Sequence, residues 1–398
     1  MQRGSFQWMK SLNKSIILNK IRTSEPISRA QIAKETKLTP PTVGTIVKEL
    51  LEQQLILESK LGESQGGRKP TMLVLNTSGF HIIGIDVGLS HIQFVISDLS
   101  GKVIDETEEV LAEEVTKEDF LALLTNGVNR LKERHDSLQF IGIGVAMHGV
   151  VESESGVSIF APNLRLRNIP IKSHLEEVFR MDVKVENDAK AFALGEAWFQ
   201  GQINHRSMVA VNIGRGIGAG IVIDGKLYNG EHGIAGEIGH MTIDINGKKC
   251  SCGNHGCLQT LASGPAIAER AKELLEKGGE SIIAEWINEQ ELSAELVHKA
   301  ALQNDQLAIK ILHDTGVYIG IALTNLVHVW DPSIIIIGGG VSKAGDYIMT
   351  SIKETLVERT ITEKAKTTLI TISQLGSYGS SLGSVALILS ELFEPTLL

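Results

Sequence analysis

The stretch VAVNIGRGIGAGIVIDG, residues 209–225, consists of two apolar runs separated by a glycine turn. Short runs rich in Val and Ile and bounded by glycine predict a hairpin of buried strands. The same pattern occurs 127 residues earlier as IIGIDVGLSHIQFVISD, residues 82–98. Two matching hairpins predict a duplicated α/β domain with a cleft between its halves. Glycine turns can hold phosphates through backbone N–H groups, although a tight hairpin also needs glycine when no ligand binds.

Polar residues lie between and after these hairpins. In VENDAKA, residues 185–191, a predicted strand delivers Asn187 and Asp188 to the start of a helix. Asp188 could act as a general base on a hydroxyl or accept a hydrogen bond from one, and the alternative is a simple helix cap. Glu237 lies three residues before His240. Asn, Asp, Glu and His together form a hydrogen-bonding set that suits a polyhydroxylated ligand such as a sugar.

All three cysteines of the chain, Cys250, Cys252 and Cys257, lie within eight residues, and His240 precedes them by ten. Three thiolates and an imidazole predict a closed tetrahedral zinc shell. Because no position is left for water, such a site would be structural and would support the edge of the ligand cleft. Two alternatives stay open. The cysteines could be buried structural thiols, and His255 could replace His240 as the fourth ligand.

The composition indicates an ordinary globular protein. A chain of 398 residues that is 42% hydrophobic predicts two or three domains. No apolar run approaches the roughly 18 residues needed to span a bilayer, and the first six residues lack the apolar core of a signal peptide. Three clustered cysteines fit a reducing compartment. We therefore expect a cytoplasmic protein without a membrane partner.

The charge of the chain is divided unevenly. Residues 1–70 hold 12 Lys/Arg and 6 Asp/Glu, whereas the remainder holds 26 and 41. A basic module on an acidic body is the distribution expected when only the front of the chain meets a polyanion. A solvated basic face without a partner is the alternative, and charge alone does not exclude it.

The first fifty residues predict three helices. Apolar residues at helical spacing over 16–21 form the first, which ends at Ser24-Glu25-Pro26. Ser28 is a candidate N-cap for a short second helix that ends near Lys37, and Thr39 is a candidate N-cap for the third. The buried stripe of the third helix consists of Val43, Ile46, Val47, Leu50 and Leu51. Two short helices joined by a tight turn predict a helix-turn-helix whose third helix reads DNA.

Two strands, residues 55–57 and 72–75, follow the third helix and predict a β-wing. The wing tip, residues 62–70, combines glycines with Arg68 and Lys69, which suits a narrow minor groove or phosphates. A plain hairpin with a solvated basic loop is the alternative. We expect DNA contacts from Arg29, Thr39, Pro41, Thr42, Thr45, Lys48, Arg68 and Lys69.

These residues resemble those of the ROK proteins, a family of bacterial repressors and sugar kinases that share an actin-like ATPase fold. The resemblance covers nearly the whole chain and is most specific in four motifs: ENDA (186–189), GEIGH (236–240), CSCGNHGC (250–257) and SQGGRKP (64–70). Kinases of the family generally lack the helix-turn-helix. The chain is therefore similar to the repressor branch, which includes xylose-, N-acetylglucosamine- and glucose-responsive regulators.

The resemblance implies an α/β fold in three parts. Residues 1–78 would form a winged helix-turn-helix, residues 79–190 the first lobe of the sugar-kinase-like domain, and residues 191–379 the second lobe with its zinc loop. A C-terminal helix at about 380–394 would return to the first lobe. The resemblance also implies that the sugar contacts are Asn187, Asp188, Glu237 and His240, and that the zinc ligands are His240, Cys250, Cys252 and Cys257.

Departures from the kinase pattern predict that ATP turnover is lost. Kinases of the family show Asp-x-Gly-Gly-Thr-Lys and Gly-Thr-Gly in their two phosphate loops. This chain differs at Leu89, Ser90, His91 and Arg215. Asp188, which matches the kinase catalytic base, remains. The family also places a glutamate sugar ligand two residues after the last cysteine, where this chain has Gln259, and the change from carboxylate to amide leaves the identity of the sugar open.

These observations predict a sugar-responsive transcriptional repressor with a structural zinc ion. Because helix-turn-helix readers use two half-sites, we expect a homodimer, or a dimer of dimers, on a roughly palindromic operator. Xylose is the first candidate effector. The alternative function is an ATP-dependent sugar kinase of the ROK hexokinase type that carries a DNA-binding domain. A third alternative, a DNA binder without a ligand, is disfavoured by the polar cleft.

Overall fold

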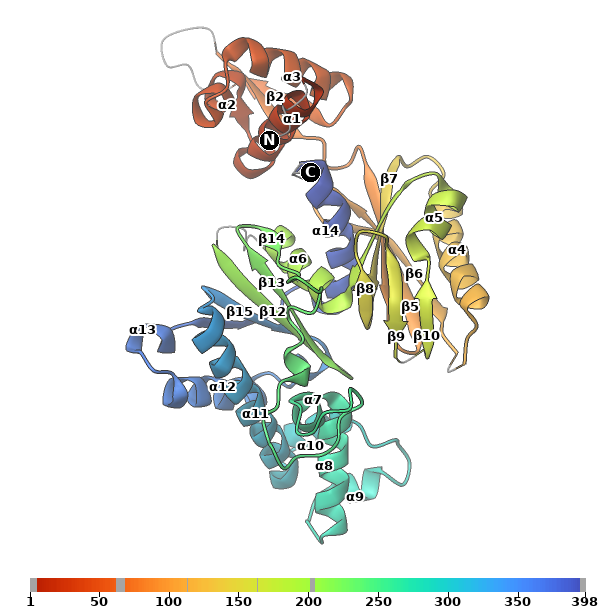
Figure 1. Cartoon of the computed structure of the whole chain (residues 1–398), viewed down its shortest axis with the longest axis vertical. Helices are drawn as coiled ribbons and strands as arrows, with labels where there is room; N and C mark the ends of the chain where they lie inside the picture. The colour runs from red at the N-terminus through yellow and green to blue at the C-terminus, as the bar shows by residue number, and fades with distance from the viewer. Residues whose placement is uncertain (1–5, 62–68, 113, 163, 201–204, 394–398) are drawn as a thin grey trace. The chain divides into compact units, whose positions relative to one another are not determined.

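The chain divides into two compact units, which hold residues 1–186 with 384–398 and residues 187–383. A computed structural model describes residues 6–61, 69–112, 114–162, 164–200 and 205–393. The first unit contains the N-terminal module and a five-stranded sheet, and the second contains another five-stranded sheet (Figure 1).

The N-terminal module consists of three helices and a small sheet with the order β1-β3-β2. Two predicted caps are confirmed: Ser28 Oγ accepts a hydrogen bond from Gln31 N at 3.2 Å, and Thr39 Oγ1 accepts one from Thr42 N at 3.4 Å. Lys37 ends the second helix with a φ of 60°. The elements are α1 (Phe6–Ser24), β1 (Ile27–Ser28), α2 (Arg29–Thr36), α3 (Pro40–Glu52), β2 (Ile56–Leu61) and β3 (Thr71–Leu75).

The stripe predicted for α3 is confirmed except at its last residue. Val43, Ile46, Val47 and Leu50 are buried, whereas Leu51 is only half-buried. Leu51 lies about 100° around the helix from Leu50 and so falls at the edge of the stripe. The strand β1 was not predicted, because two residues are too few to show a pattern. The predicted wing is present as β2 and β3, but residues 62–68 of its tip, including Arg68, lie outside the described residues.

The first sheet has the strand order β11-β7-β4-β5-β6. The predicted hairpin over 82–98 is confirmed as β4 and β5, which are antiparallel, and β4 runs parallel to β7. A smaller sheet of β10-β9-β8 follows. The strands are β4 (His81–Val87), β5 (His91–Asp98), β6 (Val103–Val110), β7 (Phe140–Met147), β8 (Val150–Glu152), β9 (Val157–Ala161), β10 (Leu166–Ile169) and β11 (Asp182–Asn187).

Helices cover both faces of the first sheet (Figure 1). On one face lie α4 (Lys117–Arg134) and α5 (Ile171–Phe179), whose apolar residues share a core with the sheet. On the other face lies α14 (Gly379–Phe393), where Ser384 Oγ accepts a hydrogen bond from Ile85 N at 3.0 Å. Gly144 on β7 is required here, because an added Cβ would lie 1.8 Å from the Ser384 carbonyl oxygen.

The second sheet repeats this topology in the order β14-β13-β12-β15-β16. The predicted hairpin over 209–225 is confirmed as antiparallel β12 and β13, and β12 runs parallel to β15 just as β4 runs parallel to β7. The duplication predicted from the two glycine turns is therefore present in the strand connections. The strands are β12 (Ser207–Ile213), β13 (Ile217–Ile223), β14 (Lys226–Leu227), β15 (Ile334–Gly338) and β16 (Leu369–Ile372).

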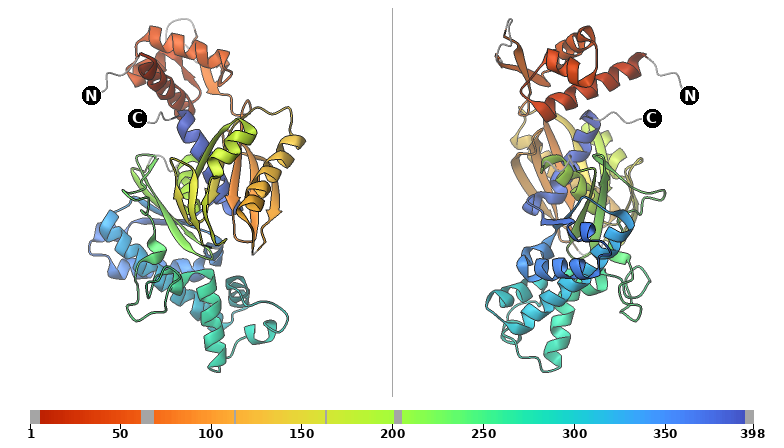
Figure 2. Two further views of the ribbon diagram at one scale, coloured as in Figure 1. Left: turned by 45° about the vertical axis from the view of Figure 1, so that its right-hand side comes forward. Right: turned by 90° about the vertical axis from the view of Figure 1, so that its left-hand side faces the viewer.

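Alternate residues of the second sheet belong to different cores. Val209 and Val211 pack with α11 (Gln306–Trp330) and α12 (Asp346–Arg359), whereas Met208 and Ala210 pack with α6 (Asp188–Phe199). Figure 2 shows these helices from two further sides. The remaining helices of this unit are α7 (Gln259–Ala262), α8 (Gly264–Glu276), α9 (Ile283–Trp286), α10 (Ala294–Leu302) and α13 (Glu363–Lys366), with short 3-10 turns η2 (Ile238–His240), η3 (Gly340–Ala344) and η4 (Gly376–Tyr378).

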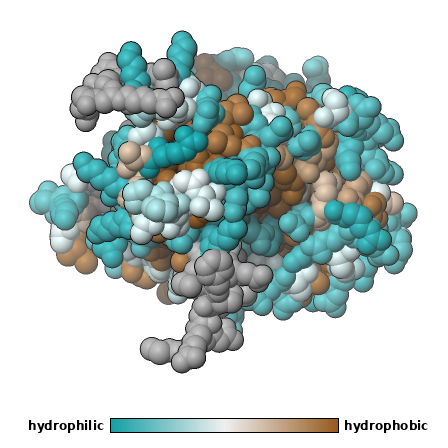
Figure 3. Space-filling view, turned by 90° about the horizontal axis from the view of Figure 1, so that it is seen from above, coloured by the Kyte–Doolittle hydropathy of each residue, from teal (hydrophilic) through white to brown (hydrophobic). Residues whose placement is uncertain are grey.

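Among the described residues, one helix, α11, is long and apolar enough to cross a membrane. Its buried residues, including Ile311, Leu323 and Val327, belong to the core of the second unit, so packing within the protein explains its apolar character. On the face drawn in Figure 3, hydrophilic residues predominate and apolar residues form patches between them.

A buried carboxyl on α6 makes stability depend on pH. Glu196 is 1% exposed and accepts a hydrogen bond from the Ser373 hydroxyl. Burial raises the pKa of Glu196, and the hydrogen bond from Ser373 opposes this in part. A raised carboxyl pKa favours folding below the unfolded pKa, and this contribution is lost as the pH rises through the folded value. We expect Glu196→Gln to remove this dependence. The difference in Tm, variant minus wild type, should grow by about a few degrees between about pH 4 and pH 8. A difference that stays constant with pH would contradict this assignment.

Candidate functional site

The junction between β11 and α6 holds the polar pair that the sequence analysis singled out. Asn187 is the N-cap of α6, since its Oδ1 accepts hydrogen bonds from Ala189 N at 3.0 Å and Lys190 N at 3.2 Å. Asp188 is the first residue of the helix. The interpretation of Asp188 as the cap is therefore wrong. Its carboxylate instead lies in the first turn, where the helix dipole favours a negative charge.

The sequence analysis missed a buried cation in the same turn. Lys190 is 4% exposed, and its Nζ donates a hydrogen bond to the Gly233 carbonyl oxygen at 2.7 Å. Its one sequence signal is a lysine among the small and apolar residues that follow Asp188. A buried lysine needs a partner. The contact ties α6 to the loop that leads into Glu237.

Glu237 completes a charged cluster with Asp188, Lys190 and His240. Burial raises the pKa of Glu237, the charges of His240 and Lys190 lower it, and the charge of Asp188 raises it. Three charge-bearing side chains from α6 and the 236–240 turn therefore act on Glu237 within the second unit. Such a cluster offers both donors and acceptors to hydroxyl groups.

Two glycines press the 236–240 turn against β13. Gly236 has a φ of +95°, and an added Cβ would lie 1.9 Å from the Ala219 carbonyl oxygen. At Gly239 an added Cβ would lie 2.0 Å from the carbonyl oxygen of Ile217. These close approaches explain the glycines of GEIGH, and they hold Glu237 and His240 at a fixed place on the sheet.

The two ring nitrogens of His240 face different groups. Its Nδ1 lies 3.6 Å from Cys250 Sγ, whereas its Nε2 lies 4.0 Å from Glu237 Oε2. One imidazole therefore connects the cysteine cluster with the charged cluster. His240 was predicted both as a zinc ligand and as a sugar contact. The ring can serve both because its two nitrogens are distinct.

His240, Cys250, Cys252 and Cys257 form a cluster that could hold a metal ion. Their four candidate ligand atoms lie within 4.8 Å of one another, and the sulfurs of Cys252 and Cys257 are 3.8 Å apart. His255 is not a member of this group in the part of the chain that the structure describes. Cys252 is exposed, so the alternative of three buried structural thiols is also wrong.

Neighbouring thiols contribute to the pKa shifts of Cys252 and Cys257. Burial, followed by hydrogen bonding with the two other thiols, raises the pKa of Cys257 to about 12. At Cys252 the pKa is lowered, chiefly because the backbone N–H of Asn254 donates a hydrogen bond to it. A bound cation would favour the thiolate form of every sulfur that it contacts.

Gln259 follows the cysteine cluster and contacts the second glycine turn. Its Oε1 accepts a hydrogen bond from Ile217 N at 3.3 Å, two residues after the exposed Arg215. Gln259 was predicted as a sugar ligand alone, and its contact with Ile217 was not predicted. An amide oxygen can accept a second hydrogen bond and the amide nitrogen can donate, so a sugar contact stays compatible with it.

The first glycine turn is closed by its own hydrogen bonds. Gly88 N donates to the His91 carbonyl oxygen at 3.1 Å, and Ser90 Oγ lies 3.1 Å from His91 Nδ1. Leu89 is half-buried. The backbone N–H of Gly88 is therefore occupied within the turn.

The expected DNA contacts lie on and beside α3. Pro41, Thr45 and Lys48 are exposed, and Lys48 Nζ lies 3.8 Å from Glu52 Oε1. Thr39 Oγ1 and Thr42 Oγ1 are 2.8 Å apart. The described positions share one face of the module, which suits a groove-reading surface.

Two further expected DNA contacts are cations outside α3. Arg29 forms an ion pair with Glu58 of the wing at 2.8 Å, so its charge is partly neutralised. Lys69 is exposed at the base of the wing.

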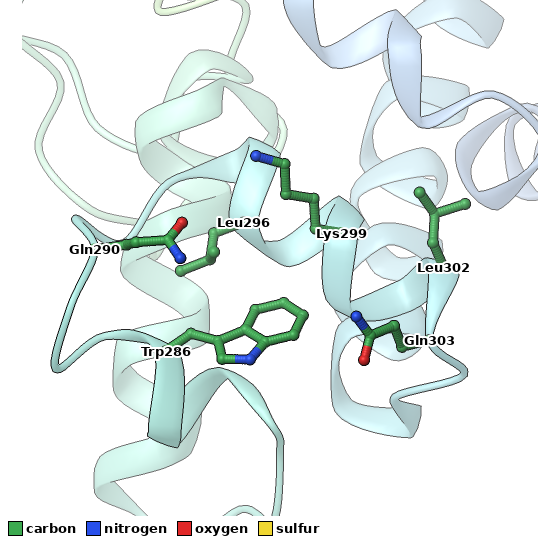
Figure 4. A pocket seen from close by; sticks show the side chains of 6 residues that line it. All are labelled: Trp286, Gln290, Leu296, Lys299, Leu302 and Gln303. Carbon is green, nitrogen blue, oxygen red and sulfur yellow. The ribbon is translucent and has the colours of Figure 1, made fainter.

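A separate surface pocket lies in the helical part of the second unit (Figure 4). It has a volume of about 390 Å³ and is lined by Trp286, Gln290, Leu296, Lys299, Leu302 and Gln303. None of the residues that the sequence analysis assigned to the sugar or the metal lines it. It is therefore distinct from the charged cluster around Glu237.

Known proteins resemble this chain over most or all of its length. The model of the ROK family matches residues 82–391. The xylose repressor of Caldicellulosiruptor bescii is 32% identical over 393 residues, 98% of this chain and 98% of that protein. The DNA-binding transcriptional dual regulator NagC of Escherichia coli is 30% identical over 402 residues, 100% of this chain and 97% of NagC.

Among solved structures, a regulator covers more of this chain than a kinase does. The crystal structure of a ROK family transcriptional regulator, a homolog of the E. coli MLC protein, matches with a TM-score of 0.84 and 30% identity over 97% of this chain and 99% of its own. A ROK family glucokinase from Streptomyces griseus, in complex with glucose and AMPPNP, has a TM-score of 0.68 and 26% identity, and covers 77% of this chain and 98% of its own. The regulators match nearly the full chain, and the glucokinase does not.

Proposed function

The chain belongs to the ROK family, and from this premise we propose that it is a transcriptional repressor whose affinity for operator DNA responds to a sugar. The observation that carries the proposal is the match of regulators over nearly the whole chain, including the N-terminal module. Because its target is DNA, we expect the protein to act in the cytoplasm.

We further propose that the metal is zinc. In a tetrahedral shell with Zn–S bonds of about 2.3 Å and a Zn–N bond of about 2.05 Å, two sulfurs lie about 3.8 Å apart and sulfur and nitrogen about 3.6 Å apart. The separation is 3.8 Å for the sulfurs of Cys252 and Cys257, and 3.6 Å for Cys250 Sγ and His240 Nδ1. A bound zinc ion would hold the loop and the His240 ring in one orientation, with Nε2 facing Glu237.

The sugar site that we propose consists of Asn187, Asp188, Glu237, His240 and Gln259. Carboxylates accept hydrogen bonds from sugar hydroxyls, whereas the imidazole and amide groups can donate or accept. Lys190 would offset part of the negative charge of Asp188 and Glu237. Xylose is the first effector to test because the similar regulator from C. bescii is a xylose repressor.

Control of DNA binding requires that the sugar prefers one conformation over another. A ligand can shift such an equilibrium only by its differential affinity for the two states. We propose that a homodimer, or a dimer of dimers, brings two recognition helices to two half-sites of a palindromic operator. The sugar would then change the spacing of the two modules.

The protein is a repressor and not a sugar kinase. Its relatives that match over nearly the full length are a xylose repressor and a DNA-binding transcriptional dual regulator, and both glycine turns depart from the kinase phosphate loops at Leu89, Ser90, His91 and Arg215. Asp188, which matches the kinase base, is retained.

An electrophoretic mobility shift with the native upstream region, with and without candidate sugars, tests the proposal. We expect a sequence-specific shift that xylose or another sugar changes. The same sugars, mixed with protein and ATP, should release no ADP above background. Absence of a specific shift under all conditions would defeat the repressor function, and turnover on the order of 1 per second or faster would support a kinase.

A further inference from the structure

Lys190 places a charged side chain in an apolar part of α6. It is the third residue of the helix and is 4% exposed. Its neighbours Ala189, Ala191 and Phe192 are buried as well. Removing an ammonium group from water is unfavourable unless the charge is paired or hydrogen-bonded. A buried lysine among such residues therefore points to a contact that an alanine could not make.

That contact is a hydrogen bond to the loop before Glu237. Lys190 Nζ donates to the Gly233 carbonyl oxygen at 2.7 Å, a short distance of the kind expected when the donor is charged. Gly233 has a φ of +71°, a backbone conformation that favours glycine. Only three residues separate Gly233 from Glu237. The position of Gly233 therefore limits where Glu237 can lie.

The strand β13 supports both sides of this contact. An added Cβ at Gly220 would lie 2.9 Å from Lys190 Cα, so α6 packs closely on the strand at this point. One residue earlier in β13, Ala219 N donates a hydrogen bond to the Gly236 carbonyl oxygen at 2.9 Å. Lys190 and the residue before Glu237 are therefore held beside adjacent residues of one strand.

The charge of Lys190 also acts on the Glu237 side chain. That side chain is 43% exposed, so packing alone does not fix it. Burial raises the pKa of Glu237, and the charges of His240 and Lys190 lower it. The attraction between ammonium and carboxylate opposes movement of Glu237 away from α6. Lys190 thus restrains Glu237 in two ways, through the backbone of the loop and through the charge of the side chain.

A carboxylate that is ordered before its ligand arrives loses less entropy on binding than one that must then be ordered. On these grounds we infer that Lys190 is a positioning residue: it does not contact the sugar effector but holds Glu237 where its carboxylate accepts a hydrogen bond from a sugar hydroxyl. The inference rests on the proposed function. It predicts that loss of Lys190 weakens sugar binding only when the Glu237 side chain is present.

A double-mutant cycle tests this dependence, with Lys190→Met, Glu237→Ala and the variant that combines them. Methionine keeps an unbranched apolar side chain at the buried site and removes both the donor and the charge. Lys190→Arg retains both and is the rescue variant. Lys353→Met removes an exposed charge from α12 of the same unit and is the matched control.

Titration calorimetry on the full chain would use D-xylose, D-glucose and N-acetyl-D-glucosamine, and then the sugar that the wild type binds most tightly. Thermal shifts at high sugar concentration would follow the variants that bind most weakly. Elemental analysis and mobility shifts would compare the zinc content and the operator binding of each protein without sugar.

We expect Lys190→Met to bind the chosen sugar about 10-fold more weakly, Lys190→Arg to recover part of this loss, and Lys353→Met to equal the wild type. In the Glu237→Ala background, Lys190→Met should change the affinity by less than about 2-fold. Zinc content and operator binding without sugar should be the same in Lys190→Met as in the wild type.

An equal loss from Lys190→Met with and without Glu237 would show that Lys190 acts independently of Glu237 and would overturn the inference. Wild-type affinity in Lys190→Met, or no recovery in Lys190→Arg, would overturn it as well, while the proposed function would stand. If Lys190→Met lowers the Tm by more than about 10 °C, Lys190→Gln takes its place under the same criteria. If the wild type binds none of the sugars, the sugar response itself fails and the inference with it.

Discussion

Replacing Cys252 with serine should remove the metal and with it most of the sugar response. A serine hydroxyl is a poor substitute for a thiolate at a soft site, so the variant should contain less than stoichiometric zinc. Without the metal, His240 Nδ1 loses its anchor and Nε2 is no longer directed toward Glu237, which lies 4.0 Å away. We expect sugar affinity to fall by about 10-fold or more. Elemental analysis and titration calorimetry measure the two effects.

His255→Ala is the matched control for this loop. His255 is exposed and lies outside the metal cluster, so the variant should keep both its zinc and its sugar affinity. Operator binding without sugar should be the same in Cys252→Ser as in the wild type, because the N-terminal module is distant in sequence and its helices and strands pack against one another. Loss of the sugar response in Cys252→Ser with full metal content would assign the loop another role.

Reversing the charge of Lys48 should weaken operator binding by about 10- to 100-fold at roughly 0.1 M salt. Lys48 is 78% exposed on α3, and Glu52 is its ion-pair partner, so Lys48→Glu leaves this part of the helix acidic. If Lys48 contacts a phosphate, the loss should be similar for operator and non-operator DNA. The slope of log affinity against log salt should fall by about 1.

Lys353→Glu makes the same charge change on the exposed surface of α12 and serves as the control. It should leave the operator affinity and its salt dependence unchanged, since net charge alone acts weakly at a distance in salt. Mobility shifts at several salt concentrations compare the three proteins. Operator affinity of Lys48→Glu equal to that of the wild type would exclude this face of α3 from the DNA interface.

Local patterns predicted the elements whose limits depend on a few adjacent residues. The two glycine turns predicted the two hairpins, and Ser28 and Thr39 predicted the starts of α2 and α3, because turns and caps depend on a few adjacent residues. Local patterns did not predict features that depend on residues far away in the sequence. Leu51 is half-buried although its spacing suggested a core residue, and the two-residue strand β1 has no signal of its own.

In the candidate site, too, residue types could be predicted from the sequence, whereas the partners of single atoms could not. The sequence was enough to propose Asn187, Asp188, Glu237, His240 and the three cysteines as ligands. Carboxylates, amides, imidazoles and thiolates are residue types that bind sugars or metals. It could not decide which residue caps α6, because both Asn187 and Asp188 can do so. It also could not choose between His240 and His255, since the choice depends on which imidazole the folded loop brings to the sulfurs.

The residue pattern was enough to predict the three helices and wing of the N-terminal module and the duplicated sheet, since each depends on short-range spacing or residue type. Only the tertiary structure decided how single polar atoms are used. It buried Lys190 beside Glu237 and tied Gln259 to the second glycine turn. Burial and hydrogen bonding of a side chain depend on segments far away in sequence, and packing alone brings those segments together.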